Sequence, residues 1–243
     1  MLDNNVQTTS HSIQGTIIEA DLREYLRKVY NFMAGGLVVT ALTSYIIMNT
    51  PLLHMFFSIS GNQVSLSILG WLILLAPLAM VFYFSSVIRN GSSSKAQTVF
   101  WIFSALMGAS LTPTVLLYTG ASIARIFLIT AATFGAMSIY GYTSKKDLSS
   151  IGSFCIMALW GIIIASLVNL FFSNSMTNTI ISIISVFIFI GLTAYDTQKI
   201  KAMYIQSSDS ETMNKIALSG ALELYLDFIN LFLALLRLFG DRK

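Results

Sequence analysis

Seven long apolar runs constrain this chain more than any other feature of its sequence. They cover residues 31–50, 64–88, 96–118, 121–142, 151–172, 176–200 and 214–239. Each run reaches or exceeds the ~20 residues that a helix needs to cross the ~30 Å hydrocarbon core of a bilayer. Lipid cannot satisfy exposed backbone groups, whereas a helix satisfies them within its own segment. The sequence therefore predicts an all-α polytopic membrane protein with seven transmembrane helices.

Composition excludes several other classes of protein. Of the 243 residues, 55% are hydrophobic and only 10% are charged, whereas soluble domains carry roughly 25% charged residues. The formal net charge of +3 is too small an excess to indicate nucleic-acid binding, so we expect no nucleic-acid partner. The single cysteine, Cys155, excludes an internal disulfide and a thiolate metal cluster.

The chain is predicted to have a short N-terminal part and one membrane domain. We expect residues 1–28 to form a polar tail, disordered over 1–17, and then an amphipathic basic helix in the membrane interface. Residues 29–243 should form a single seven-helix transmembrane domain. In the lead-in helix, apolar side chains at helical spacing oppose basic ones: Ile18, Leu22, Tyr25, Leu26 and Val29 against Arg23, Arg27 and Lys28.

The basic residues set the expected orientation. With a cytoplasmic N-terminus, the cytoplasmic connections hold most Lys and Arg residues, whereas 51–63 and 173–175 contain none. The positive-inside rule therefore orients the first six spans with the N-terminus of the chain in the cytoplasm. The short tails favour a bacterial plasma membrane, the inner membrane, over the membrane of an organelle. A seventh full crossing puts Arg237, Arg242 and Lys243 outside, whereas a re-entrant segment returns them inside. The length of 214–239 favours a full crossing with tilt.

Small residues predict where helices approach one another. Ala131 and Gly135 form one small-xxx-small pair, and Gly161 and Ala165 form another. Such pairs let two helix backbones come close in a membrane.

Acidic residues at membrane depth are the main functional candidates, because a central Asp costs about 2.5–3.5 kcal/mol on the insertion scale. Only Asp196, Glu223 and Asp227 lie within the apolar runs. Spacings of four, three and seven place Glu223, Asp227, Asn230 and Arg237 on one stripe of the last helix. That stripe should face the interior of the bundle.

Two interpretations of the aspartates stay open. In the structural one, Asp227 is neutral and hydrogen-bonded, or pairs with Arg237 or Lys199. In the functional one, Asp196 and Asp227, on successive antiparallel spans, share a proton or bind a cation such as Ca²⁺, for which carboxylates are suitable ligands. For Lys199, one turn after Asp196, snorkelling to the membrane surface is favoured over a counter-ion role.

Four segments make the sequence similar to a known family. They are LRKVYNFMAGGL in the first span, SLTPTVLLYTGASIARIFLITAATFGAMSIYGYTSKKDLSSIGSF in the middle, and AYDTQKIK and LYLDFINLFLALLRLFG around the aspartates. From about Leu26 to Gly240 the chain resembles the Bax inhibitor-1, or transmembrane Bax inhibitor motif, family, and in particular its prokaryotic members.

The resemblance implies six helices around a central seventh, and a pH-sensitive calcium leak. An aspartate dyad, here Asp196 and Asp227, is implied as proton sensor, cation-binding site and gate, with Ca²⁺ as the transported ion and no cofactor. Glu223 and Asn230 are possible supporting residues. A basic latch residue is also implied, for which Arg89 is the nearest candidate, in a loop that is longer and more polar than in the family.

Two other function classes are weighed against the leak. A non-transporting membrane regulator would contact membrane lipid and bind a membrane protease or a component of a stress or cell-death pathway. An intramembrane aspartyl protease would also carry two Asp residues. However, this chain reads Leu-Tyr-Leu before Asp227 and has no proline after Pro113, unlike the motifs of those enzymes. We therefore expect that the protein is not an enzyme.

Overall fold

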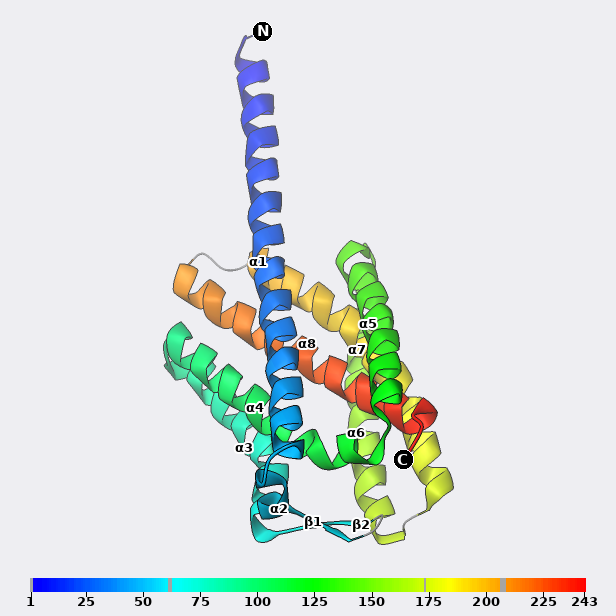
Figure 1. Cartoon of the computed structure of the whole chain (residues 1–243). Helices are drawn as coiled ribbons and strands as arrows, with labels where there is room; N and C mark the ends of the chain where they lie inside the picture. Colours follow the sequence, from blue (N-terminus) through cyan, green and yellow to red (C-terminus); the bar gives the residue numbers. More distant parts are fainter. Residues whose placement is uncertain (1, 61–62, 173, 206–208) are drawn as a thin grey trace.

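The computed structural model describes residues 2–60, 63–172, 174–205 and 209–243. These residues form eight helices and one β-hairpin (Figure 1). In chain order they are α1 (Leu2–Met48), α2 (Leu52–Phe56), β1 (Phe57–Ser60), β2 (Gln63–Leu66), α3 (Ile68–Asn90), α4 (Ser93–Leu117), α5 (Gly120–Thr143), α6 (Ser149–Phe172), α7 (Ser175–Ile205) and α8 (Ser210–Phe239). The predicted all-α architecture is confirmed apart from the short hairpin.

Six of these helices are long and apolar enough to cross a membrane. They are the Ala20–Met48 part of α1 and, wholly or over most of their length, α3 to α7. The helix α8 is long enough to cross but is not among these six spans. The structure therefore supports six apolar spans, and a seventh crossing by α8 stays a prediction.

The last long helix, α8, lies inside the bundle and not at its surface (Figure 1). It packs against α1, α3, α4, α5 and α7, and residues are buried along most of its length. The helix α6 makes its extensive contacts with α7 instead. Because neighbouring helices cover the middle of α8, Asp227 is shielded from lipid, whereas Glu211 and Arg237 near the two ends of the helix are exposed. This explains how a helix of this composition can lie within the bundle.

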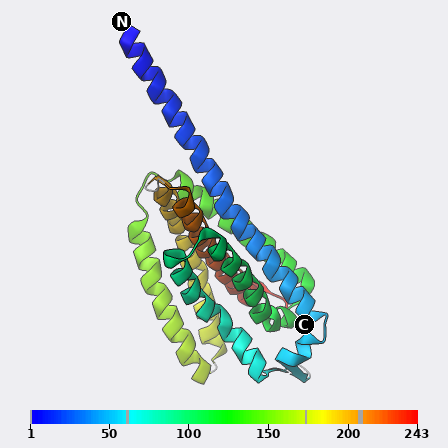
Figure 2. The ribbon, with the colours of Figure 1, turned by 90° about the vertical axis from the view of Figure 1, so that its left-hand side faces the viewer.

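The helix α1 corrects the prediction for the N-terminal part. It runs without a break from Leu2 to Met48, so the lead-in helix and the first span are one helix, which extends beyond the bundle (Figure 2). Disorder over residues 1–17 is wrong for the part of the tail that the structure describes. The apolar side chains of Leu22, Tyr25, Leu26 and Val29 are buried against other helices, so this face is not left free to dock on a membrane surface.

A β-hairpin replaces the predicted start of the second span at residue 64. Strand β1 pairs antiparallel with β2, with Phe57 opposite Leu66, and α3 begins only at Ile68. Ser67 ends the hairpin and caps α3, since its Oγ accepts from the N–H of Gly70 at 3.0 Å. Hydropathy alone extended the span too far, because it does not register this polar cap.

The close helix approaches lie at other glycines than those predicted. A Cβ added at Gly135 or Gly161 would meet no atom within 4 Å, so neither glycine of the two small-xxx-small pairs marks a close approach of another helix. The backbone contacts lie instead at Gly108, against Thr40 of α1, and at Gly141, against Ala194 of α7. Both glycines let a backbone carbonyl of the neighbouring helix approach directly.

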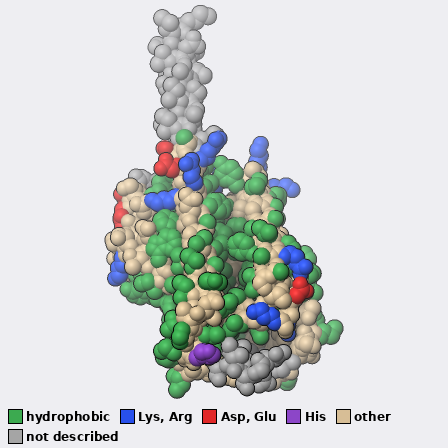
Figure 3. All heavy atoms as spheres, in the orientation of Figure 1, with side chains coloured by type: hydrophobic (Ala, Val, Ile, Leu, Met, Phe, Trp, Pro, Cys, Tyr) green, Lys and Arg blue, Asp and Glu red, His purple; other side chains and the backbone are tan. Residues whose placement is uncertain are grey.

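The two ends of the bundle differ in charge. The α3–α4, α5–α6 and α7–α8 connections lie at the same end as residues 20–28 of α1, and many Lys and Arg side chains gather there (Figures 1 and 3). The C-terminus lies at the opposite end from the N-terminus (Figure 1). This geometry agrees with the alternation from which the orientation was predicted.

Candidate functional site

The structure brings Asp196 of α7 and Asp227 of α8 together inside the bundle. Asp227 is only 5% exposed. The two carboxyl groups lie close enough to act on each other electrostatically. The Oδ2 atom of Asp227 is buried and has no hydrogen-bond partner among the described residues. Of the acidic residues predicted to lie at membrane depth, this one is therefore the least satisfied.

The pair has a simple electrostatic requirement. A buried carboxylate without partners is costly, and a second carboxylate beside it raises that cost. A proton shared between Asp196 and Asp227, or a cation bound to their oxygens, removes the repulsion. The arrangement is thus chemically suited to exchange a proton for a cation.

A salt bridge lies next to the aspartates. Lys199 Nζ and Glu223 Oε2 are 3.0 Å apart, and both side chains are 33% exposed. The snorkelling interpretation of Lys199 is therefore corrected, because its ammonium group is held by Glu223 of α8. Both groups also act electrostatically on Asp196 and Asp227, so the site has one basic and three acidic side chains.

A buried hydroxyl network, which sequence reasoning missed, holds α8 close to the aspartates. Thr40 Oγ1 lies 2.9 Å from the carbonyl oxygens of both Gly36 and Ser104, and 2.6 Å from the hydroxyl of Tyr225. Because Thr40 donates its single proton to a carbonyl, Tyr225 donates to Thr40. This network joins α8 to α1 and α4 two residues before Asp227. The sequence feature that could have indicated this network is Tyr225, a hydroxyl-bearing residue between two leucines of α8.

Among the described residues, no hydrogen bond or ion pair joins the other candidates to the pair. Asn230 Nδ2 donates to the Leu226 carbonyl at 2.8 Å, and Asn230 lines a cavity that Arg237 also lines. Arg89 is exposed at the end of α3, and within the described ranges no ion pair joins Arg89 or Arg237 to either aspartate.

The described residues contain no group of three or more His, Cys, Asp or Glu side chains arranged to hold a metal ion. Ca²⁺ takes six to eight oxygen ligands in a resident site. Asp196 and Asp227 can therefore supply only part of a coordination shell, and water or backbone oxygens would have to complete it.

These features define a class: a small polytopic helical membrane protein in which the last two long helices, α7 and α8, each contribute one member of an interacting, largely buried carboxyl pair. Residues 22–243 match the family described as inhibitor of apoptosis-promoting Bax1. The chain belongs to this Bax inhibitor-1-like family, as the resemblance indicated.

Curated relatives cover nearly the whole chain. The uncharacterized protein RP147 of Rickettsia prowazekii (strain Madrid E) is 42% identical over 244 residues, which is 100% of both chains. The inner membrane protein YbhL of Escherichia coli (strain K12) is 43% identical over 227 residues, which is 92% of this chain and 94% of YbhL. An uncharacterized protein of Borreliella burgdorferi is 44% identical over 222 residues, 90% of this chain and 93% of that one.

Proposed function

We propose that this protein is a passive calcium leak whose pH-sensitive gate is the pair Asp196–Asp227. The observation that carries the proposal is the buried Oδ2 atom of Asp227, which has no partner among the described residues and lies beside a second carboxyl group. Because no described group hydrogen-bonds to that oxygen, a proton or a cation held between the two carboxyl groups is what can satisfy it. A site that exchanges protons and cations has a reason to keep it available.

The small number of protein ligands at the Asp196–Asp227 pair favours passage of Ca²⁺ through the site over its retention there. Conduction requires binding that is favourable enough to admit an ion and weak enough to release it. Two carboxylates, with the third acidic side chain, Glu223, already paired with Lys199, meet this condition better than a resident calcium site does. Lys199, held by Glu223 at 3.0 Å, further limits how strongly a cation can be retained.

The pH response follows from competition for the same oxygens. At low pH a proton occupies the pair and excludes the cation. At high pH both groups ionise, and two carboxylates about 4 Å apart at an effective dielectric near 20 repel by ~4 kcal/mol. A cation or a displacement of α7 against α8 relieves that repulsion. Cation occupancy therefore increases with pH.

We propose a bacterial inner membrane as the location, since the relative YbhL is an inner membrane protein. In this proposal the N-terminus is cytoplasmic and α8 is the seventh crossing. Support comes from the 30-residue length of α8 and from the C-terminus at the opposite end of the bundle (Figure 1).

Calcium flux through the purified full chain in vesicles, measured from pH 6 to pH 8, tests the proposal. We expect Asp227→Asn and Asp196→Asn each to flatten the pH dependence, and the double variant to add little, because the two groups act as one unit. Glu223→Gln should have a smaller effect. Asp147→Asn, which changes an exposed carboxylate in the α5–α6 connection, is the matched control.

Two outcomes contradict the proposal. If both single variants keep the wild-type pH profile, the pair is not the gate. If the wild-type protein gives no flux at any pH in this range, the alternative is favoured: a membrane regulator that acts through lateral contacts with a membrane protease or another partner.

A further inference from the structure

A polar cavity of about 640 Å³ lies at the end of the bundle that holds the C-terminus. Its volume is in the ~300–1,000 Å³ range of ligand sites. The guanidinium-bearing residues Arg237 and Arg242 line it, together with Ser166, Asn169 and Asn178. Among the described residues that line this cavity, none is acidic. The cavity therefore combines positive charge with hydroxyl and amide groups.

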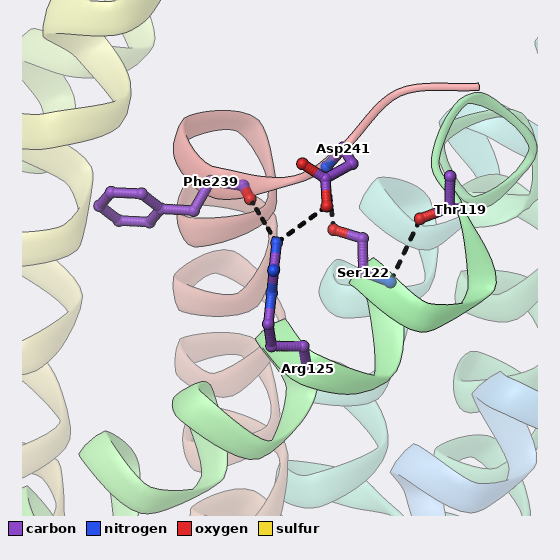
Figure 4. A network of polar contacts seen from close by, with 5 residues as sticks. All are labelled: Thr119, Ser122, Arg125, Phe239 and Asp241. Carbon is purple, nitrogen blue, oxygen red and sulfur yellow. Dashed lines mark hydrogen bonds and ion pairs between the residues drawn. The ribbon is translucent and has the colours of Figure 1, made fainter.

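The C-terminal tail, which carries Arg242, is anchored beside this cavity. Arg125 Nη2 and Asp241 Oδ2 form an ion pair at 3.0 Å, and the Asp241 N–H donates to Ser122 Oγ at 2.9 Å (Figure 4). The Thr119 N–H donates to the Asp241 carbonyl at 3.0 Å. This network holds the backbone just before Arg242 in place. The carboxylate next to Arg242 in the sequence, that of Asp241, is already paired with Arg125.

The two cavity arginines are left for another partner. The guanidinium of Arg242 lies over the Tyr118 ring, 5.9 Å from its centre, at the outer limit of a cation–π contact. In the described part of the chain, neither Arg237 nor Arg242 forms an ion pair. Two guanidinium groups that share a cavity repel each other, so an anion between them would be stabilising.

A second cavity, of about 330 Å³, adjoins the first. Both cavities are lined by Ser166, Ile181 and Arg237. Further along α6, α7 and α8, the walls of the second cavity are mainly apolar and include Phe189 and Leu233. The two cavities together have a cationic, polar end near the surface of the bundle and an apolar end at the depth of the helices.

We propose that an anionic phospholipid binds here, with its phosphate between Arg237 and Arg242 and an acyl chain in the second cavity. Guanidinium groups match phosphate through paired, charge-assisted hydrogen bonds. A free phosphate ion would fill the polar end but leave the apolar end empty. This site is separate from the aspartate pair, and the proposal does not depend on ion flux.

Thermal unfolding of the purified full chain in neutral detergent tests the proposal, since a ligand of the folded state raises the unfolding temperature. The probes are phosphatidylglycerol, phosphatidylethanolamine and inorganic phosphate. We expect phosphatidylglycerol to stabilise the protein at lower concentrations than the other two. The double variant Arg237→Gln, Arg242→Gln should bind it about tenfold or more weakly, as expected for a lost hydrogen bond to a charged group.

Two further variants sharpen the test. Lys145→Gln, Lys146→Gln removes the same charge from exposed positions in the α5–α6 connection, so its affinity for phosphatidylglycerol should stay within about twofold of wild type if the site is local. Ser166→Phe places a ring where the two cavities meet, and should weaken binding of the lipid but not of inorganic phosphate.

Several results would overturn the proposal. Equal stabilisation by phosphatidylethanolamine would remove the requirement for a net negative lipid. Equal stabilisation by inorganic phosphate would make this a site for free anions. Unchanged lipid binding in the arginine variant, or an equal loss in the lysine control, would show that the cavity does not hold the headgroup. Should the arginine variant not fold, the comparison of the three probes on the wild-type chain still decides.

Discussion

Replacing Gly141 by Ala should destabilise the protein although it adds only one methyl group. A Cβ at this position would contact the carbonyl oxygen of Ala194 and lie 2.9 Å and 3.0 Å from the carbonyl carbon and Cα of the same residue. All three atoms belong to the backbone of α7, so no side-chain rotation can make room. Overpacking of this kind costs about 1–3 kcal/mol.

That cost can be measured as a change in unfolding temperature. For a chain of about 150–250 residues, 1 kcal/mol shifts the midpoint by about 2–4 °C, so Gly141→Ala should lower it by about 2–12 °C. Because Asp196 follows Ala194 by two residues, a displacement of α7 should also shift the pH profile of calcium flux. The unfolding temperature is measured on the purified chain in detergent, and the pH profile of calcium flux on the purified chain in vesicles.

Gly135→Ala is the matched control on the same helix. A Cβ there meets no atom within 4 Å, and Ala favours a helix over Gly by about 0.8–1.0 kcal/mol. This variant should therefore be neutral or slightly stabilised. The reasoning would be refuted if the two substitutions had equal effects, or if Gly141→Ala unfolded at the wild-type temperature.

Three further predictions follow from other contacts. Tyr225→Phe removes the 2.6 Å hydrogen bond to Thr40 and should cost about 0.5–1.5 kcal/mol, seen as a lower unfolding temperature; an unchanged midpoint would contradict the network. Hydrogen bonds from Ser93 lower the pKa of Glu211, so this carboxylate stabilises the fold above its ordinary pKa of about 4.3, and that contribution is lost as pH falls through the lower folded-state value. Unfolding of wild type and Glu211→Gln should therefore differ at neutral pH and converge in acid. A cysteine at Lys243, in a Cys155→Ser background, should react with an impermeant reagent in intact cells if α8 is a full crossing, whereas labelling only after lysis would exclude it.

Local sequence patterns predicted most of the helices and the position of Asp196 and Asp227 within the last two of them. Apolar runs locate the spans because each helix must satisfy its own backbone within lipid. Five of the six spans supported by the structure lie close to their predicted limits, whereas the first begins at Ala20 and not at residue 31. The exceptions are informative. A hydropathy average does not detect a single capping residue such as Ser67. It also does not detect that the polar residues before the first span continue the same helix, α1.

The sequence by itself determined that Asp196 and Asp227 would be costly and would lie on neighbouring antiparallel helices. Only the tertiary structure decided which groups surround them: the salt bridge between Lys199 and Glu223, and the hydroxyl of Tyr225 on α8. The same holds for the contacts at Gly141 and for the cavity shared by two arginines. Hydropathy and spacing are properties of one segment, whereas the rotation of each helix and its approach to a neighbour depend on how all the side chains pack together.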